Sequence, residues 1–148
     1  MKTMSKVVMS AAVAAVVVLS GCAGPDVATM KAADYGPYPA DYQAVIADYH
    51  AHTLKDPESA RVQYLGGPVK GYIKANPIAR DATYGYLVCM DVNAKNSFGG
   101  YTGNERTAVF IRDGKVMRYV NASAGDDVAA GMVKSMCANV IGHTGEGK

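Results

Sequence analysis

The chain has 148 residues, 49% of them hydrophobic and 19% charged, and its formal net charge is +2 at pH 7. This length allows one domain with a modest hydrophobic core. The charge excludes the large basic excess that is typical of chains that bind nucleic acid.

The N-terminal residues have the pattern of a secretory signal peptide. Lys2 and Lys6 precede an apolar run over residues 7–19, and no acidic residue occurs before Asp26. As a helix this run would measure about 20 Å, whereas the hydrocarbon core of a bilayer is about 30 Å thick. The run is therefore too short for a comfortable transmembrane helix, and residues 1–21 are expected to be a signal peptide.

The residues Leu19-Ser20-Gly21-Cys22 resemble the lipobox of bacterial lipoproteins. In that family a diacylglyceryl group is attached to the cysteine sulfur, the chain is cut before this cysteine, and the new amino group is acylated, for example with palmitate. The resemblance implies an envelope protein anchored by lipid on Cys22. Since Ala23 rather than an aspartate follows, it also implies the periplasmic face of the outer membrane if the cell is Gram-negative. Two or three acyl chains anchor a protein without a transmembrane helix. An ordinary secretory signal with a chance cysteine is the alternative.

Cleavage before Cys22 would change the balance of charges and cysteines. It removes two of the 15 basic residues, which leaves 13 basic against 13 acidic residues. Cys89 and Cys137 then remain as an even pair in an oxidising compartment. We expect a disulfide that contributes about 4 kcal/mol in the chain-entropy model, with two buried free thiols as the alternative. Two isolated cysteines with no nearby histidine do not predict a metal site.

The first part of the mature chain is expected to be a flexible tether. Residues 22–40 contain three prolines and no sustained periodicity, and would span up to about 60 Å if fully extended. A helix is expected over residues 41–54. Lys55-Asp56-Pro57 ends it, because a residue before proline disfavours helical dihedral angles. Its apolar face would be formed by Tyr42, Val45, Ile46 and Tyr49.

Strand patterns follow this helix. Two short strands are expected at residues 61–65 and 69–73, separated by Gly66-Gly67-Pro68, and the clearest strand covers residues 84–92. Residues 107–112 and 115–120 form a further pair, because the Asp113-Gly114 between them is a preferred hairpin turn.

A C-terminal helix is expected over residues 126–140, with Asp126 near its N-terminus and Gly142 after its end. We therefore predict a single α+β domain over residues 41–142, followed by a tail at residues 143–148. Its antiparallel sheet of about four strands would be flanked by an N-terminal and a C-terminal helix, in the order α-β-β-β-β-α.

Two segments resemble a family of small secreted or lipid-anchored bacterial proteins. The first is the sequence LKDPESA at residues 54–60, and the second is CMDVNAKNSFGGYTG at residues 89–103. Members of this family share a pattern similar to L-x-D-P-x-S-A … C-x-x-V-N-A-K-N-S-[FY]-G-G-Y-T-G. The resemblance covers residues 50–120, and its second motif is long enough to be specific. It implies an envelope location and supplies no catalytic mechanism.

The second motif places a long loop, residues 93–103, between two strands. It exceeds the two to five residues that a hairpin needs, and its glycines permit positive φ angles. One interpretation is a recognition loop for a protein, glycan or peptidoglycan fragment. The alternative is a self-contained loop whose Asn and Ser side chains hold its own backbone while Phe98 fills the core. The candidate recognition residues are Asn93, Lys95, Asn96, Ser97, Phe98 and Tyr101.

Histidine and glycine patterns do not predict a metal or cofactor site. His50 and His52 would point about 200° apart on a helix, so they would not share one ion. His143 lies in the glycine-rich tail. Gly99-Gly100 lacks the Lys-Ser/Thr continuation of a phosphate loop. We expect no metal site and no cofactor.

Catalytic patterns are equally weak. Lys95 and Ser97 have the residue types of a Ser–Lys nucleophile and base, but nothing in the sequence supplies an oxyanion hole. Asp91 with Glu105 or Asp113 would be a carboxylate pair, although Asp113 is better explained by its turn.

These observations favour a membrane-anchored, non-enzymatic envelope lipoprotein, a binding or envelope-assembly module that presents residues 93–103 to a protein or glycan. It would contact the membrane through the lipid on Cys22 and would not bind nucleic acid. The alternatives are an enzyme that acts on cell-wall or periplasmic substrates, and an inhibitor that presents the same loop to another enzyme.

Overall fold

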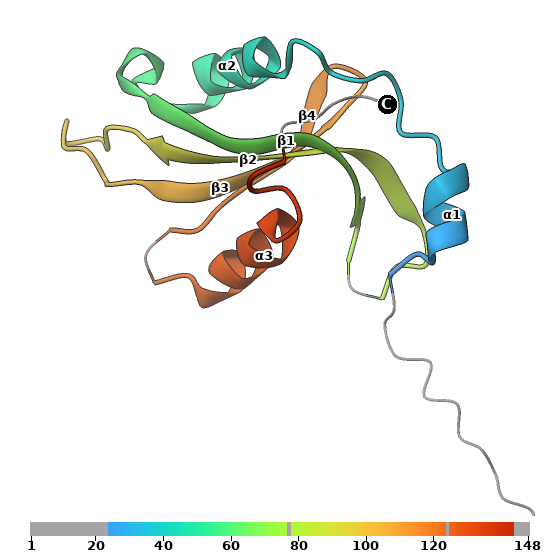
Figure 1. Cartoon of the computed structure of the whole chain (residues 1–148). Helices are drawn as coiled ribbons and strands as arrows, with labels where there is room; N and C mark the ends of the chain where they lie inside the picture. Colours follow the sequence, from blue (N-terminus) through green and yellow to red (C-terminus); the bar gives the residue numbers. More distant parts are fainter. Residues whose placement is uncertain (1–23, 77, 124, 144–148) are drawn as a thin grey trace, which may run out of the picture.

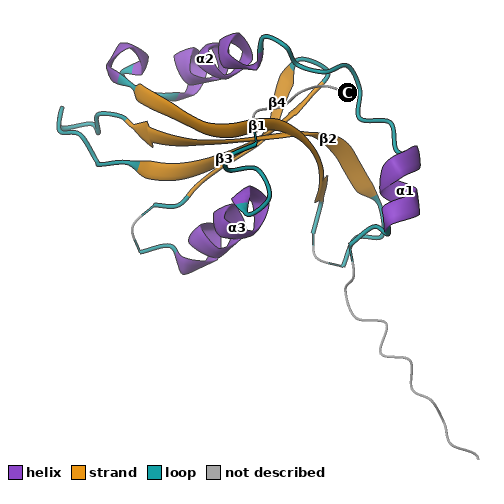
Figure 2. Cartoon of the chain, viewed as in Figure 1, coloured by secondary structure: helices purple, strands orange, loops and turns teal. Residues whose placement is uncertain are grey.

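A computed structural model describes residues 24–76, 78–123 and 125–143. A four-stranded antiparallel sheet with strand order β1-β2-β3-β4 forms the centre, with helices on both sides (Figure 1 and Figure 2). This arrangement confirms the expected α+β class and the four-stranded antiparallel sheet. The predicted signal peptide and Cys22 lie outside the described residues. Within the described ranges, no helix is long and apolar enough to cross a membrane.

The sheet is a simple meander. Its strands are β1 (Arg61–Lys74), β2 (Ala82–Asn93), β3 (Glu105–Arg112) and β4 (Lys115–Asn121). Asp113 and Gly114 have φ angles of 51° and 68° between β3 and β4. Positive φ at both central residues is the conformation that a two-residue hairpin turn of this type requires. The Asp-Gly turn therefore forms where the sequence predicted it.

The first strand corrects a prediction, because residues 61–74 form one long strand rather than two short ones. Gly66-Gly67-Pro68 lies inside it as an irregularity, and the register with β2 shifts on both sides of Gly66. Close packing explains why glycines occur here. A Cβ atom on Gly66 would overlap the backbone of Val140, and one on Gly67 would overlap the backbone of Leu87. The glycines permit close approach at this point and do not break the strand.

The C-terminal segment packs on this irregularity. The amide of Gly142 donates to the carbonyl of Leu65 at 3.0 Å, and the amide of Gly67 donates to the carbonyl of His143 at 2.7 Å. The sequence predicts that His143 belongs to the tail, but its carbonyl oxygen is hydrogen-bonded to β1. Residues 144–148, the rest of that tail, lie outside the described residues.

Alternating side chains of the strands point to opposite faces of the sheet and form two separate hydrophobic cores. Helix α2 (Tyr42–Thr53) covers one face through the fully buried Ile46, and helix α3 (Asp127–Cys137) covers the other through Val133 and Cys137. The α2 core includes Val88, Met90, Val92, Val109 and Ile111. The α3 core includes Leu87, Cys89, Ala108, Phe110 and Val140. Packing of a helix on each face buries the apolar side chains of both faces and stabilises the small sheet.

A disulfide links the sheet to α3. The sulfur atoms of Cys89 and Cys137 are 1.99 Å apart, and the Cα atoms are 5.8 Å apart. Both cysteines are buried in the α3 core. The pairing agrees with the disulfide expected from the sequence.

The segment before α2 corrects the expectation of a flexible tether. It contains a short helix, α1 (Val27–Ala32), and then packs on the sheet through Tyr35, which is only 7% exposed. The ring of Tyr35 makes an edge contact with Tyr84 at 5.5 Å between centroids. The expected order of elements is therefore incomplete, because α1 and the 3-10 helix η1 (Pro57–Ser59) also precede the sheet.

Arg112 ties this segment down. Its Nη1 atom donates to the carbonyl oxygens of Asp34 at 2.8 Å and of Tyr84 at 2.6 Å, and its Nη2 atom donates to the Asp34 carboxylate at 3.1 Å. The amide of Gly36, followed by the charge of Arg112, lowers the pKa of Asp34. These contacts join residues 34–36 to the sheet, so the folded domain begins well before residue 41.

Candidate functional site

The loop between β2 and β3 extends the hairpin to a narrow tip. The amide of Thr102 donates to the carbonyl of Ala94 at 3.2 Å, and Lys95 pairs with Tyr101 as an isolated β-bridge. The amide of Asn96 donates to the carbonyl of Gly100 at 2.8 Å. The loop is thus an ordered arm that projects from one end of the sheet (Figure 1).

Two asparagine side chains hold the backbone of this arm. The Oδ1 atom of Asn96 accepts hydrogen bonds from the amides of Phe98 at 2.9 Å and Gly100 at 3.1 Å. The Oδ1 atom of Asn93 accepts from the amide of Gly103 at 3.1 Å. Such local bonds are the reason that Asn is favoured in turns. Asn93 and Asn96 therefore shape the loop, and their carbonyl oxygens are already used.

Phe98 occupies the tip and points into solvent, with 97% of its surface exposed. The interpretation in which Phe98 fills the core is wrong. Gly99 follows it with a φ of 80°, a conformation that glycine adopts without strain and that lets the chain reverse directly behind the ring. The turn therefore presents a large apolar side chain at the far end of the arm.

Tyr101 forms the other aromatic surface of the loop and is 40% exposed. The guanidinium carbon of Arg61 lies 4.5 Å from its ring centroid, and the Nζ atom of Lys95 lies 5.6 Å from it. Cations within about 6 Å of an aromatic ring are attracted to its face. Two basic side chains thus lie close to the ring of Tyr101.

The two motifs identified in the sequence meet at this loop. The Nζ atom of Lys55 donates to the Oγ atom of Ser97 at 2.5 Å, and the Nζ atom of Lys95 lies 4.0 Å from the Asp56 carboxylate. Lys55 and Asp56 belong to the segment that leads into η1. No local pattern predicts that Lys55 and Arg61 contribute to the loop surface, although Lys55 lies within the first motif and Arg61 directly follows it.

The arrangement does not have the features of a nucleophilic site. Ser97 contacts Lys55 rather than Lys95, and both Ser97 and Lys55 are exposed. A lysine acts as a base in enzymes when burial removes water from its ammonium group, and neither contact here provides that environment. The Lys95 ammonium faces Asp56 and Tyr101 instead.

The carboxylates considered as a catalytic pair are engaged separately. Asp91 accepts two hydrogen bonds from Arg106, at 2.5 and 3.3 Å, and this contact raises the pKa of the arginine. Glu105 accepts from the Nδ2 atom of Asn121 at 2.7 Å, and Asp113 accepts from Arg112 at 3.2 Å. The structure does not bring these carboxylates together as a pair.

His50 and His52 differ sharply in environment. His50 is 4% exposed and its Nε2 atom lies 3.0 Å from the hydroxyl oxygen of Tyr119, and burial lowers the pKa of this imidazole. Burial also raises the pKa of Tyr119 to about 12. His52 is exposed on the same helix. The pair cannot share a ligand, as the sequence indicated.

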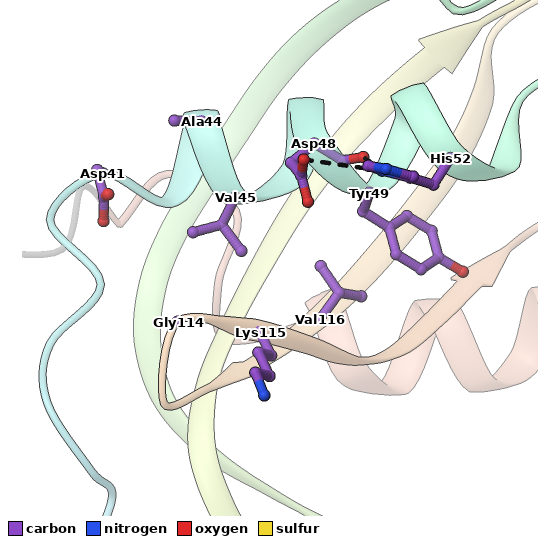
Figure 3. Close-up of a pocket in the computed structure, with 9 residues that line it drawn as sticks. All are labelled: Asp41, Ala44, Val45, Asp48, Tyr49, His52, Gly114, Lys115 and Val116. Carbon is purple, nitrogen blue, oxygen red and sulfur yellow. Dashed lines mark hydrogen bonds and ion pairs between the residues drawn. The ribbon is translucent and has the colours of Figure 1, made fainter.

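The histidine that is exposed lines an open pocket of about 470 Å³ between α2 and the start of β4. His52 lies 3.7 Å from the Asp48 carboxylate, while Asp41 stands apart from this pair (Figure 3). Lys115 comes from the opposite wall. Within residues 24–143, leaving aside positions 77 and 124, no group of three or more His, Cys, Asp and Glu side chains is placed to hold a metal ion.

Comparison of the chain with protein-family models, with curated proteins and with solved structures finds no match.

Proposed function

We propose that this chain is a lipid-anchored protein of the bacterial cell envelope that binds a partner through the loop at residues 93–103 and has no catalytic activity of its own. The lipobox-like residues before Cys22 support the anchor, and Ala23 supports the periplasmic face of the outer membrane if the cell is Gram-negative. The partner would be an envelope protein with a concave apolar pocket for the Phe98 ring, or an envelope glycan.

The observation that carries the proposal is the exposure of Phe98 on an ordered tip. Aromatic residues are enriched in the core of interfaces, where a few buried side chains contribute most of the binding energy. Asn96 fixes the backbone on both sides of the ring, at Phe98 and Gly100. A preorganised loop loses less conformational entropy on binding, so the same contact gives higher affinity.

The surroundings of the tip suit a polar rim around that anchor. Lys55, Lys95 and Arg61 place positive charge beside Ser97 and Tyr101, and Asp56 adds a carboxylate. Interfaces commonly combine an apolar centre with a polar edge, and arginine and tyrosine are more frequent in interfaces than on the rest of a protein surface. This arrangement supports recognition more than catalysis, because its polar groups bind one another at the surface.

An inhibitor of another enzyme is the second candidate. An inhibitor loop enters an active-site cleft and must hold its shape there, and a protruding, internally bonded tip favours that role. The two candidates use the same residues and differ only in the partner.

A photo-crosslinking experiment in cells tests the binding site. A photoreactive residue is placed at position 98 of the full-length protein, and in a control at Met117, which is 55% exposed on β4. We expect a discrete adduct with an envelope protein or glycan at position 98 only, and its loss when Tyr101→Ala and Lys95→Ala are added. Equal labelling at both positions, or none at 98, would refute the loop as the binding site.

The anchor needs a separate test. We expect the wild-type protein to fractionate with membranes and its N-terminal peptide to carry a lipid mass on Cys22, whereas Cys22→Ser should be soluble and unlipidated. A wild-type chain without lipid would remove the anchor from the proposal, while leaving the crosslinking result intact.

A further inference from the structure

The end of the domain opposite the Phe98 loop, where β1 is joined to β2, lies close in space to Gly24, two residues after Cys22 (Figure 1). Gly24, the first described residue, packs so tightly against the hydroxyl of Tyr72 that a Cβ atom there would overlap it. Tyr72 lies near the C-terminal end of β1, where Lys74 pairs with Ala82 at the start of β2. In Figure 1 the first coloured residues lie beside the turn that joins β1 to β2.

Covalent geometry then limits how far this end can move from a lipid on Cys22. Two residues span at most about 8 Å, whatever path they take. The expected tether of residues 22–40 does not lengthen this link, because residues 24–36 pack on the sheet through Gly24, Tyr35 and Arg112. A chain anchored at Cys22 would therefore hold the β1–β2 end of the domain at the bilayer surface.

The side chains exposed at this end are those that a bilayer interface accepts. Ile78, in the β1–β2 connection, is 85% exposed, and Val27 on α1 is 75% exposed. Lys31, Lys70 and Arg80 are exposed in the same part of the molecule. Apolar residues flanked by lysine and arginine suit the boundary between headgroups and acyl chains.

Tyrosines accompany these residues. The ring of Tyr84 contacts the rings of both Tyr35 and Tyr72, and the Nζ atom of Lys70 lies 5.2 Å from the centroid of the Tyr35 ring. Val27, Lys31, Tyr35 and Lys70 also line one shallow cavity. Tyr35 itself is buried, but Tyr72 and Tyr84 are half-buried. Amphipathic aromatic rings and lysines are enriched at the headgroup level of membranes.

We propose that this end, formed by α1 and the β1–β2 connection, lies on the bilayer that holds the anchor, with Ile78 inserted at the interface. The inference rests on the lipid anchor of the proposed function. It fixes the orientation of the domain, because β2 has twelve residues and separates this end from the loop by about 35 Å. The Phe98 tip then points away from the membrane.

The absence of tryptophan from the chain makes a direct test available. Two single-tryptophan variants, Ile78→Trp and Phe98→Trp, place the same fluorophore at exposed apolar positions at opposite ends. Each is purified as the full lipoprotein and reconstituted in vesicles of phosphatidylcholine and phosphatidylglycerol, with and without bromine on the acyl chains. We expect a blue shift and loss of emission by bromine quenching at position 78, and neither change at position 98.

Three outcomes are separated by one further measurement, the mass of the N-terminal peptide. Lipidated protein with no quenching at 78 would overturn the membrane-facing end and leave the anchor intact. Lipidated protein with quenching at 98 would overturn the orientation. A chain without lipid on Cys22 would instead overturn the anchor, and the inference would fall with it.

Discussion

Asn96→Ala should loosen the tip of the loop without unfolding the domain. The substitution removes the one acceptor that binds the amides of both Phe98 and Gly100. Both bonds are exposed to solvent, so each contributes at the lower end of the usual range, about 0.5 kcal/mol. Together they contribute about 1 kcal/mol, which corresponds to a roughly fivefold change in an opening equilibrium.

Amide hydrogen exchange measured by NMR gives the local readout. In Asn96→Ala the amides of Phe98 and Gly100 should exchange about fivefold faster than in the wild type, while amides in the middle of β2 and β3 should not change. The matched control is Asn96→Asp, which keeps an oxygen acceptor at the same position and should exchange nearly as slowly as wild type. Identical exchange in the wild type and the alanine variant would refute the role of Asn96 in holding the tip.

Three further predictions concern the fold. Burial lowers the pKa of His50 in the folded state, so as the pH drops below about 6.5 the unfolded chain takes up a proton first and the free energy of unfolding should fall. Urea midpoints should show this decline in the wild type and much less in His50→Gln. Replacing Cys89 and Cys137 together by alanine should lower the free energy of unfolding by about 4 kcal/mol, and a reductant should have no further effect on the variant. A urea midpoint of the variant equal to that of the oxidised wild type would contradict a stabilising disulfide. Arg112→Ala should lower the free energy of unfolding by about 2 kcal/mol and make residues 27–40 sensitive to protease, whereas Arg80→Ala, at an exposed position, should do neither. Protease resistance of Arg112→Ala equal to that of the wild type would show that Arg112 does not hold this segment on the sheet.

Local sequence patterns were sufficient for most of the regular elements. The period of apolar residues located α2 and α3, and the Asp-Gly pair located the turn between β3 and β4. These signals work because each depends on residues that are neighbours in the chain. The even number of remaining cysteines was likewise enough to expect the pairing of Cys89 with Cys137.

The sequence-based predictions were wrong where contacts between residues distant in the chain determine the local structure. Prolines made residues 22–40 resemble a tether, but Arg112 and the Tyr35 contacts with the sheet come from a segment more than 40 residues away, and no local pattern reports them. Gly66-Gly67 has the composition of a strand break, but these glycines are needed because the backbones of Val140 and Leu87 approach them closely.

The candidate loop was located from its motif, but not its orientation. An aromatic residue in a loop is equally compatible with burial and exposure, and the direction of Phe98 depends on the turn that Asn96 stabilises. The contacts of Lys55 with Ser97 and of Arg61 with Tyr101 join residues about 40 positions apart in the chain, so no local pattern predicts them.

The contact of the C-terminal segment with β1 has a consequence for how copies of this protein coexist. A 14-residue strand at the edge of a sheet turns a long row of amides and carbonyls outward, which is a template for pairing with another chain. Gly142 and His143 occupy that row at its middle, at Leu65 and Gly67, and so divide it into two shorter stretches. If the protein is anchored on a membrane as we propose, its copies meet by diffusion in two dimensions and encounters between edges are frequent. A segment of the chain's own at the middle of β1 then disfavours the continuous strand pairing from which aggregates grow.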